Sequence, residues 1–161
     1  MGMTEDQVRE RAGKKLELDD IDPKLALSGV GQVTTMKQLG FLGEGSSYKP
    51  DGWYLPTDRG AVALLLETKG EDLVPIDSPS LKEQVEKYCT LARSKYDLVI
   101  GLVHDGVQTR AYVNGKPFEV PDELQPKEYY FSLLTDRPID QERIYELTMR
   151  INNTLHSDFG I

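Results

Sequence analysis

The sequence predicts a mixed α/β fold in which a central mixed sheet is flanked by helices. Helix signals stand near the start, the middle and the end of the chain, with strand-like apolar runs between them. These signals do not alternate regularly between strand and helix, which argues against repeated βαβ units. A chain of 161 residues can bury one sizeable core, so we expect residues 1–161 to form a single domain.

The first helix is predicted over residues 4–16. Thr4 and Gln7 have the spacing of a capping box, which satisfies free backbone groups at a helix N-terminus. An apolar stripe at helical spacing follows, formed by Val8, Ala12 and Leu16. Glycines recur between residues 19 and 45 and weaken the signal there, so that residues 32–35 are only a candidate strand.

Two strands and a helix are predicted in the middle of the chain. Residues 48–55 are extended and aromatic-rich, residues 56–60 have turn composition, and residues 61–69 are apolar enough for a buried strand. Ser80 and Glu83 form a second capping box, which opens a helix that continues to about residue 94. The apolar stripe of this helix consists of Leu81, Val85, Tyr88 and Ala92.

The last third of the chain combines a hairpin with a further strand and a helix. Residues 97–103 form a short apolar run, and Asp105-Gly106 is a two-residue hairpin signal that leads into residues 108–113. Another strand is predicted over residues 129–134. A final helix is predicted to begin near Ile139, because apolar residues recur at helical spacing beyond it.

The composition favours a cytoplasmic protein that does not enter a membrane. The longest apolar run, residues 61–66, is far shorter than the roughly 20 residues that cross a bilayer. The first twenty residues are charged and lack the apolar core of a signal peptide. Cys89 is the one cysteine, which excludes an internal disulfide and agrees with a reducing compartment.

The net charge of −8 conflicts with simple binding of nucleic acid. Proteins that grip nucleic acid by themselves usually present a basic face to the phosphates. Either nucleic acid is not the substrate, or the affinity comes from another domain and from bound cations. The middle helix region does carry a local basic excess, which either meets phosphates or is a solvated face: Lys82, Lys87, Arg93 and Lys95.

Two carboxylates and a lysine are predicted to meet at one end of the sheet. Asp51 lies near the start of one central strand and Glu67 near the end of the next, so antiparallel pairing across a short loop brings them together. Glu67 and Lys69 are two residues apart and project from the same face. Asp51, Glu67 and the backbone carbonyl of Thr68 offer the oxygen ligands that Mg²⁺ prefers, with Mn²⁺ as a substitute. Lys69 would position the attacking water in phosphodiester hydrolysis.

The order of these residues resembles the PD-(D/E)xK nuclease superfamily. Pro50-Asp51 is followed, after fifteen residues, by Glu67-Thr68-Lys69. Gln84 and Tyr88 on the following helix resemble the QxxxY signature of one branch. That branch includes the nuclease domains of type I restriction motor subunits and bacterial recombination nucleases. The resemblance covers residues 48–104 and implies a restriction-endonuclease-like core.

The resemblance also implies roles for further residues. Gln84 and Tyr88 would line the active site and orient the substrate phosphate or the lysine. The first helix would pack beside the site, with Glu10 as an additional metal ligand. Residues 151–161 resemble the joint that precedes an adenine methyltransferase domain in restriction-modification fusions, so the chain would be the nuclease module of a longer enzyme.

Together these features predict a Mg²⁺-dependent DNA endonuclease of a restriction-modification enzyme. Its expected partners are double-stranded DNA, methyltransferase and target-recognition domains or subunits, and a second copy that pairs transiently to cut both strands. Two alternatives stay open. One is a non-catalytic module that keeps the nuclease scaffold for DNA binding or assembly, and the other is a stand-alone exonuclease or junction-cleaving enzyme.

Overall fold

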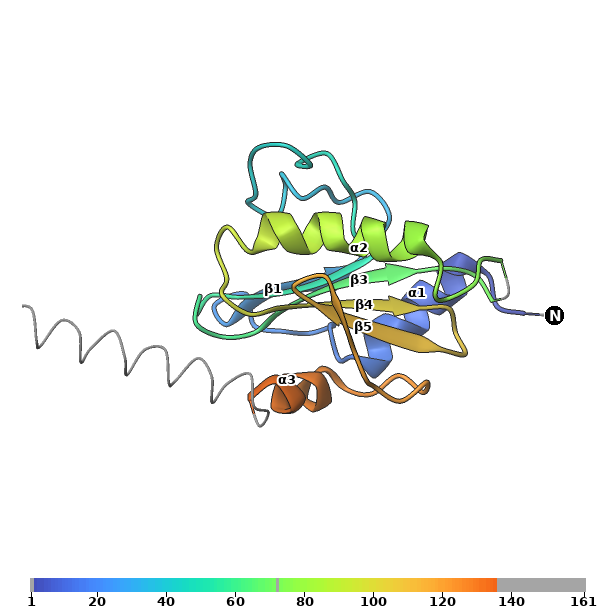
Figure 1. Cartoon of the computed structure of the whole chain (residues 1–161). Helices are drawn as coiled ribbons and strands as arrows, with labels where there is room; N and C mark the ends of the chain where they lie inside the picture. The colour runs from blue at the N-terminus through green and yellow to red at the C-terminus, as the bar shows by residue number, and fades with distance from the viewer. Residues whose placement is uncertain (1, 72, 136–161) are drawn as a thin grey trace, which may run out of the picture. The chain divides into compact units, whose positions relative to one another are not determined.

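The computed structural model describes residues 2–71 and 73–135. Contacts divide the chain into two units, Met1–Pro126 and Lys127–Ile161. The first unit contains a six-stranded mixed sheet with helices on both faces (Figure 1). Its elements are α1 (Glu5–Lys15), β1 (Ala26–Val30), β2 (Gly52–Pro56), β3 (Ala63–Thr68), α2 (Pro79–Ala92), β4 (Val99–His104), β5 (Thr109–Val113) and β6 (Lys116–Phe118). The predicted mixed α/β class is confirmed.

The strands lie in sequence order across the sheet, from β1 to β6. Every neighbouring pair is antiparallel except β3 and β4, which are parallel and are connected through α2. Strand β3 is buried along its whole length. Because a strand next to a parallel neighbour is covered on both faces, it reads as a continuous apolar run, as Ala63 to Leu66 do.

Helix α2 packs on one face of the sheet through its apolar stripe. Gly101 on β4 permits the close approach, because a Cβ there would lie 2.8 Å from Cys89 Sγ and 3.0 Å from Val85 Cγ2. The predicted stripe is confirmed, since its four members are buried. The sheet lines this core with Trp53, Leu55, Ala63, Leu65, Val99, Val103 and Tyr112.

Helix α2 begins two residues earlier than the predicted capping box implies. The helix begins at Pro79, whose fixed backbone suits the first helical position. Ser78 is the N-cap, and its hydroxyl bonds to the hydroxyl of Ser80 at 2.8 Å. Ser80 therefore lies inside the helix, and the capping box predicted at this residue is wrong.

Helix α1 packs on the opposite face of the sheet. The predicted capping box is present, with Gln7 N–H donating to Thr4 Oγ1 at 3.3 Å and Thr4 N–H donating to Gln7 Oε1 at 3.0 Å. Gly52 at the start of β2 leaves room for this core, because a Cβ there would lie 2.9 Å from Leu66 Cδ2 and 3.4 Å from Leu18 Cδ1. The predicted apolar stripe is buried as expected: Val8, Ala12 and Leu16.

The first strand lies earlier than predicted. Residues 32–35 are not a strand, and β1 occupies Ala26–Val30 instead. Glycine lowers the strand propensity of a segment. For this reason the sequence pattern contains no clear signal for β1. Gly29 is nevertheless well suited to its place, because a Cβ there would lie 3.3 Å from the ring of Trp53 on the neighbouring strand.

The segment between β1 and β2 folds back on itself above α2 (Figure 1). Met36 N–H donates to Tyr48 O, and Lys37 N–H donates to Ser46 O, both at 2.8 Å. Met36 and Phe41 are buried in the same core as the α2 stripe. These contacts hold the segment against the helix.

Two turns connect the last three strands of the sheet, one between β4 and β5 and the other between β5 and β6. The predicted two-residue turn at Asp105-Gly106 is wrong, because His104 pairs with Thr109 and a four-residue loop lies between them. The Asp105 carboxylate closes that loop by accepting from two backbone N–H groups at 2.9 and 2.7 Å. The two-residue turn is Asn114-Gly115, where φ is 52° and 76°. It adds β6, which was not predicted.

The second unit is described from Lys127 to Thr135, which form helix α3. The strand predicted over residues 129–134 is therefore wrong. Its aromatic residues favour strands, but Pro126 precedes a segment in which Tyr130 and Leu134 recur at helical spacing. The predicted helix from Ile139 and the joint at residues 151–161 lie outside the described residues. Among the described helices, none is long and apolar enough to span a membrane.

Candidate metal centre and active site

The register of β2 and β3 brings Asp51 and Glu67 together. Gly52 pairs with Leu66 in this antiparallel pair, so the next residues outward, Asp51 and Glu67, lie opposite each other. The pairing continues through Asp51 N–H, which donates to Leu66 O at 2.9 Å. Asp51 is 6% exposed and Glu67 is 2% exposed. The predicted convergence at one end of the sheet is confirmed, and the two carboxylates are buried.

Asp51 is held from two sides. Its Oδ2 accepts from the backbone N–H of Thr68 at 2.8 Å, and its Oδ1 accepts from Arg9 Nε at 3.2 Å. Arg9 Nη1 also donates to Asp6 Oδ1 at 2.8 Å. Burial lowers the pKa of Arg9, but the hydrogen bonds to both carboxylates outweigh it and raise that pKa. Arg9 is thus a fixed cation at the edge of the acidic site.

Glu67 is oriented by α2. Tyr88 OH lies 2.7 Å from Glu67 Oε2 and donates to it, and the same oxygen of Tyr88 lies 3.2 Å from the carbonyl of Lys49. Gln84 Nε2 in turn donates to Tyr88 OH at 3.3 Å. The chain from Gln84 through Tyr88 to Glu67 links the exposed surface of α2 to the buried carboxylate.

Lys69 lies beside the same carboxylate, as its position two residues after Glu67 predicts. Its Nζ is 4.0 Å from Glu67 Oε1 and 3.7 Å from Glu5 Oε1. The Lys69 side chain is 25% exposed, whereas that of Glu67 is 3% exposed. The ammonium group therefore stands at the solvent side of the cluster.

The third carboxylate comes from Glu5 in the first turn of α1. Oxygen atoms of Glu5, Asp51 and Glu67 all lie within 4.8 Å of one another, which is close enough to hold one metal ion. Glu10, the predicted ligand from this helix, is not in the cluster. Its side chain is 71% exposed and pairs with Lys14 at 3.6 Å. The helix does pack beside the site, but through its first turn.

Burial and charge repulsion change the proton affinity of this cluster. Burial and the neighbouring Asp51 raise the pKa of Glu67 to about 8, although Tyr88 and Lys69 act in the opposite direction. Burial and the charge of Glu67 also raise the pKa of Tyr88, so its hydroxyl stays a donor. At neutral pH and without metal, Glu67 therefore holds a proton that a bound cation would displace.

The donor set fits a hard divalent cation. Three carboxylates offer only oxygen, which Mg²⁺, Mn²⁺ and Ca²⁺ prefer over softer metals. Thr68 lies at the end of β3 with its N–H bonded to Asp51, and its carbonyl as a ligand stays a prediction. The partly exposed Lys69 and the exposed Gln84 leave a side from which a charged substrate can approach.

Comparison with known proteins identifies no relative of this chain. No family model, no curated protein and no solved structure matches the chain. The function must therefore be inferred from the geometry and chemistry of the described residues.

Proposed function

We propose that this chain is a Mg²⁺-dependent nuclease that hydrolyses phosphodiester bonds of DNA. The observation that carries the proposal is the convergence of Glu5, Asp51 and Glu67 within 4.8 Å, with Lys69 at the solvent side. Buried carboxylates that repel one another destabilise a fold, so their grouping at one strand end favours a role with a cation.

Each residue of the site has a chemical task in this proposal. Glu5, Asp51 and Glu67 would hold the Mg²⁺ ion, which when bound supplies charge neutralisation at the phosphoryl oxygens and lowers the pKa of water. The Lys69 ammonium orients the attacking water by hydrogen bonding and favours its deprotonated form. Tyr88 keeps Glu67 in position by donating to Oε2.

The architecture supports the same proposal. A mixed sheet flanked by helices, with α1 beside the acidic site, agrees with what the resemblance implies for a restriction-endonuclease-like core. The setting within a restriction-modification enzyme depends on residues 151–161, outside the described part of the chain. We therefore keep double-stranded DNA, methyltransferase partners and transient pairing of two copies as parts of the proposal.

One observation favours a non-catalytic alternative. Arg9 Nε already occupies a position 3.2 Å from Asp51 Oδ1, and both side chains are about nine-tenths buried. An internal cation of this kind can neutralise the carboxylate without metal. A scaffold that binds nucleic acid and never cuts it would keep such an ion pair.

Metal-dependent cutting and metal binding test the proposal together. The isolated chain and its Lys69→Ala variant are incubated with supercoiled plasmid in Mg²⁺ or Mn²⁺, and we expect nicking only by the unmodified chain. Calorimetric titration with Mn²⁺ should show saturable binding that Glu5→Gln weakens by about tenfold or more. Glu10→Gln is the matched control and should bind Mn²⁺ like the unmodified chain. Equal cutting by the Lys69→Ala variant would contradict the assigned site, and absent Mn²⁺ binding would favour the inert scaffold.

A further inference from the structure

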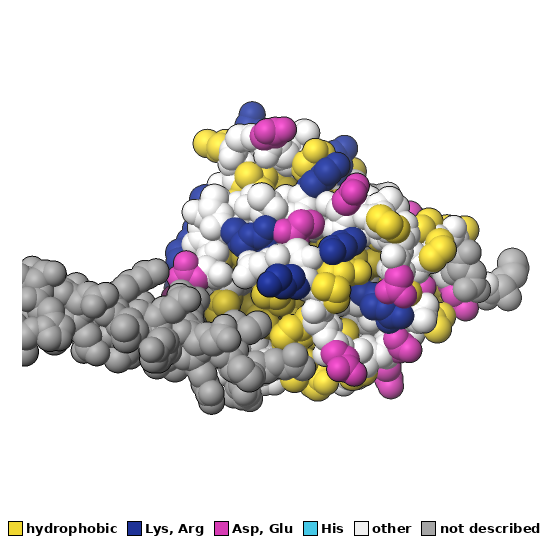
Figure 2. Space-filling model, in the orientation of Figure 1, with side chains coloured by type: hydrophobic (Ala, Val, Ile, Leu, Met, Phe, Trp, Pro, Cys, Tyr) yellow, Lys and Arg dark blue, Asp and Glu magenta, His cyan; other side chains and the backbone are white. Residues whose placement is uncertain are grey.

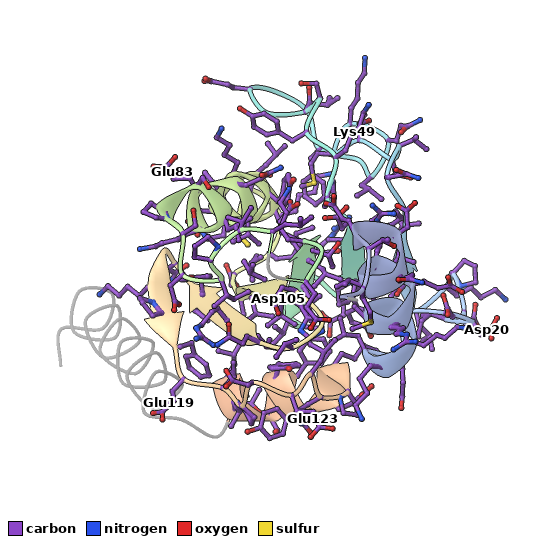
Figure 3. The ribbon with its side chains drawn as sticks, turned by 90° about the vertical axis from the view of Figure 1, so that its right-hand side faces the viewer. Asp20, Lys49, Glu83, Asp105, Glu119 and Glu123 are labelled. Atoms are coloured by element: carbon purple, nitrogen blue, oxygen red, sulfur yellow. The ribbon has the colours of Figure 1, made fainter. Side chains whose placement is uncertain are left out.

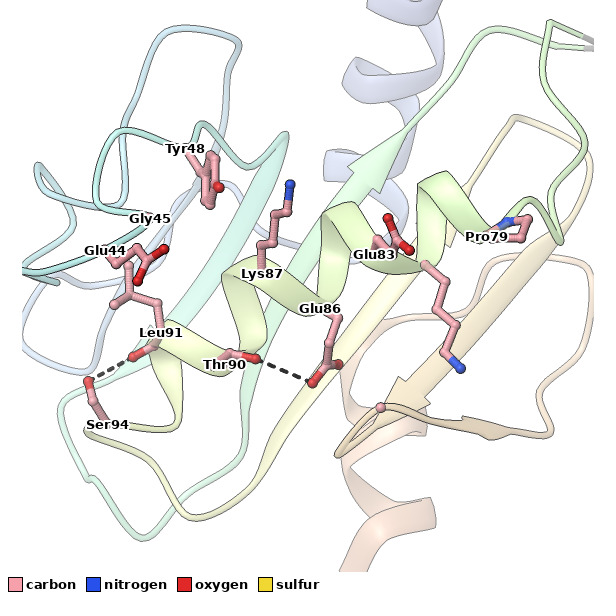
Figure 4. A pocket seen from close by; sticks show the side chains of 12 residues that line it. Glu44, Gly45, Tyr48, Pro79, Glu83, Glu86, Lys87, Thr90, Leu91 and Ser94 are labelled. Atoms are coloured by element: carbon pink, nitrogen blue, oxygen red, sulfur yellow. Dashed lines mark hydrogen bonds between the residues drawn. The ribbon is translucent and has the colours of Figure 1, made fainter.

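Two neighbouring hollows lie along the exposed surface of α2, and one of them reaches Tyr88, which contacts Glu67 of the acidic centre. The first, of about 420 Å³, is lined by Lys49, Gln84 and Tyr88, and so reaches the side chains that lead to Glu67. The second is larger, about 790 Å³, and continues toward the end of α2 (Figure 4). Tyr48, Glu83 and Lys87 line both hollows, which makes them one groove.

The wall opposite α2 is preformed. This wall belongs to the segment that precedes β2. In Figure 3, the labelled Lys49 in this segment and Glu83 on α2 mark the two sides of the groove. Tyr48 is fixed through its backbone, which accepts from Met36 N–H at 2.8 Å and donates to Gly45 O at 3.1 Å. Gly45 has φ of 90°, and a Cβ there would lie 3.0 Å from the Tyr48 ring. Glycine thus lets the ring lie close to its own loop.

An aromatic ring and lysines face this groove. Tyr48 is 36% exposed, and its ring meets that of Tyr88 edge to face with centroids 6.4 Å apart. Lys87 Nζ lies 5.1 Å from the centroid of the Tyr48 ring. In Figure 4, Lys87 rises from α2 toward the loop that carries Tyr48. A base stacked on the Tyr48 ring would displace the Lys87 ammonium group from the ring. The ammonium group would then be free to contact a neighbouring phosphate.

The charge of the groove argues against binding that depends on phosphate contacts alone. Three lysines and three glutamates line the two hollows, so the lining has no net charge. Figure 2 likewise shows Lys and Arg side chains over α2 interspersed with acidic ones. Duplex binding depends on many phosphate contacts, which this lining does not offer. Stacking requires no net charge, but it requires an unpaired base.

We propose that this groove binds a single strand of nucleic acid and leads it to the acidic centre. The inference rests on the proposed function, because it concerns the substrate of that same site, and it assigns a single strand there in place of the double-stranded DNA named above. Tyr48 is the stacking platform, and Lys49 and Lys87 contact phosphates. The stretch of α2 from Ser80 to Ala92 is about 18 Å long, which matches about five stacked nucleotides.

Binding without cutting tests the groove separately from catalysis. The full chain is titrated into fluorescein-labelled oligothymidylate of about twenty nucleotides, and into a labelled hairpin duplex, with Ca²⁺ in place of Mg²⁺, and anisotropy is recorded. We expect the single strand to bind at least tenfold more tightly than the duplex. Tyr48→Ala should weaken single-strand binding by about 5- to 150-fold, the range measured for loss of one stacking residue, and Tyr48→Phe should retain it.

Matched variants separate stacking from charge and from misfolding. Lys87→Gln should weaken binding and flatten its salt dependence, because one phosphate contact is lost. Lys24→Gln removes an exposed lysine next to β1, away from the groove. It should change neither the affinity for the single strand nor the salt dependence of that affinity. Circular dichroism of each variant identifies a loss of fold, and Lys87→Gln carries the test if Tyr48→Ala does not fold.

The outcomes distinguish the groove from the nuclease. Equal affinity for single strand and duplex, or unchanged affinity in both Tyr48→Ala and Lys87→Gln, would overturn the groove even if plasmid cutting persists. Tight single-strand binding that depends on Tyr48, without cutting of either the single strand or the plasmid in Mg²⁺ or Mn²⁺, would uphold the groove and refute the nuclease.

Discussion

Replacing Glu67 by glutamine should stabilise the metal-free protein at alkaline pH. Glu67 is buried beside Asp51, and its pKa is about 8 against an ordinary value of 4.5. Glutamine keeps the shape of the side chain and can still accept a hydrogen bond from Tyr88, but it carries no charge. The substitution therefore isolates the cost of ionising a buried carboxylate.

The pH dependence follows from the direction of this shift. Between pH 4.5 and 8 the folded protein holds a proton on Glu67 that the unfolded chain has lost, so the free energy of unfolding falls as pH rises. A difference of 3.5 pH units (8 minus 4.5) corresponds to about 5 kcal/mol. This loss is complete above pH 8 and absent below pH 4.5. Glu67→Gln should abolish it.

Urea denaturation in EDTA measures this effect directly. Unfolding free energies of the unmodified chain and Glu67→Gln are compared at pH 5, where we expect near equality, and at pH 9, where the variant should be more stable by several kcal/mol. Metal at ten times the dissociation constant of the unmodified chain should then restore about 1.4 kcal/mol to that chain at pH 9 and about 0.4 kcal/mol or less to the variant, whose affinity should be about tenfold lower or weaker still. Parallel pH profiles for the two proteins would refute the assigned burial and charge of Glu67.

Three further substitutions test other contacts. Arg9→Gln should tighten Mn²⁺ binding in calorimetry, because it frees Asp51 of a competing cation, and should lower the metal-free unfolding free energy by about 3 kcal/mol. Tyr88→Phe should fold normally but cut DNA about 10- to 150-fold more slowly in single-turnover assays, because Glu67 loses its donor. Gly101→Ala should cost about 1–3 kcal/mol in urea denaturation, because its Cβ would lie 2.8 Å from the cysteine sulfur on α2.

Controls sharpen each of these results. Arg11→Gln removes an exposed arginine from the same helix and should change neither stability nor Mn²⁺ affinity. Slower cutting by Tyr88→Phe that accompanies an unchanged Mn²⁺ affinity would assign its hydroxyl to the reaction, whereas unchanged cutting would remove it from the site. Removing the sulfur by Cys89→Ala in the Gly101→Ala background should recover part of the lost stability, and no recovery would mean that the strain lies elsewhere.

The sequence predicted those parts of the fold that follow from local pattern. Strand β3 and the stripe of α2 were found because Ala63–Leu66 and Leu81–Ala92 carry strong apolar patterns. Strand β1 was missed because its glycine makes room for the ring of a tryptophan on the neighbouring strand. This requirement arises from a contact between strands, and local sequence preference does not reveal it. Helix α3 was mistaken for a strand because aromatic residues favour strands only where a sheet is present to receive them.

The site was predictable where two strands form it and not where a helix joins it. Asp51 and Glu67 follow from antiparallel pairing alone. To predict the acidic residue on α1, one must know which face of the helix is buried. At 100° per residue around the helix axis, Glu5 lies about 60° from the buried Val8, while Glu10 lies about 160° from it. This arithmetic favours Glu5, and it was available from the predicted stripe. Arg9 carried no signal, because its role depends on which end of the helix meets the sheet.

The contacts of the acidic site span very different distances along the chain. Glu67 and Tyr88 are 21 residues apart, whereas Arg9 and Asp51 are 42 apart. Doubling a loop adds about 0.6 kcal/mol to the entropy cost of closing it, and distant contacts form late in folding. We therefore expect the strands and α2 to associate first and α1 to dock afterwards. A newly made chain would hold two of the carboxylates before it holds the third, so the capacity to bind metal would arise only in the last step of folding.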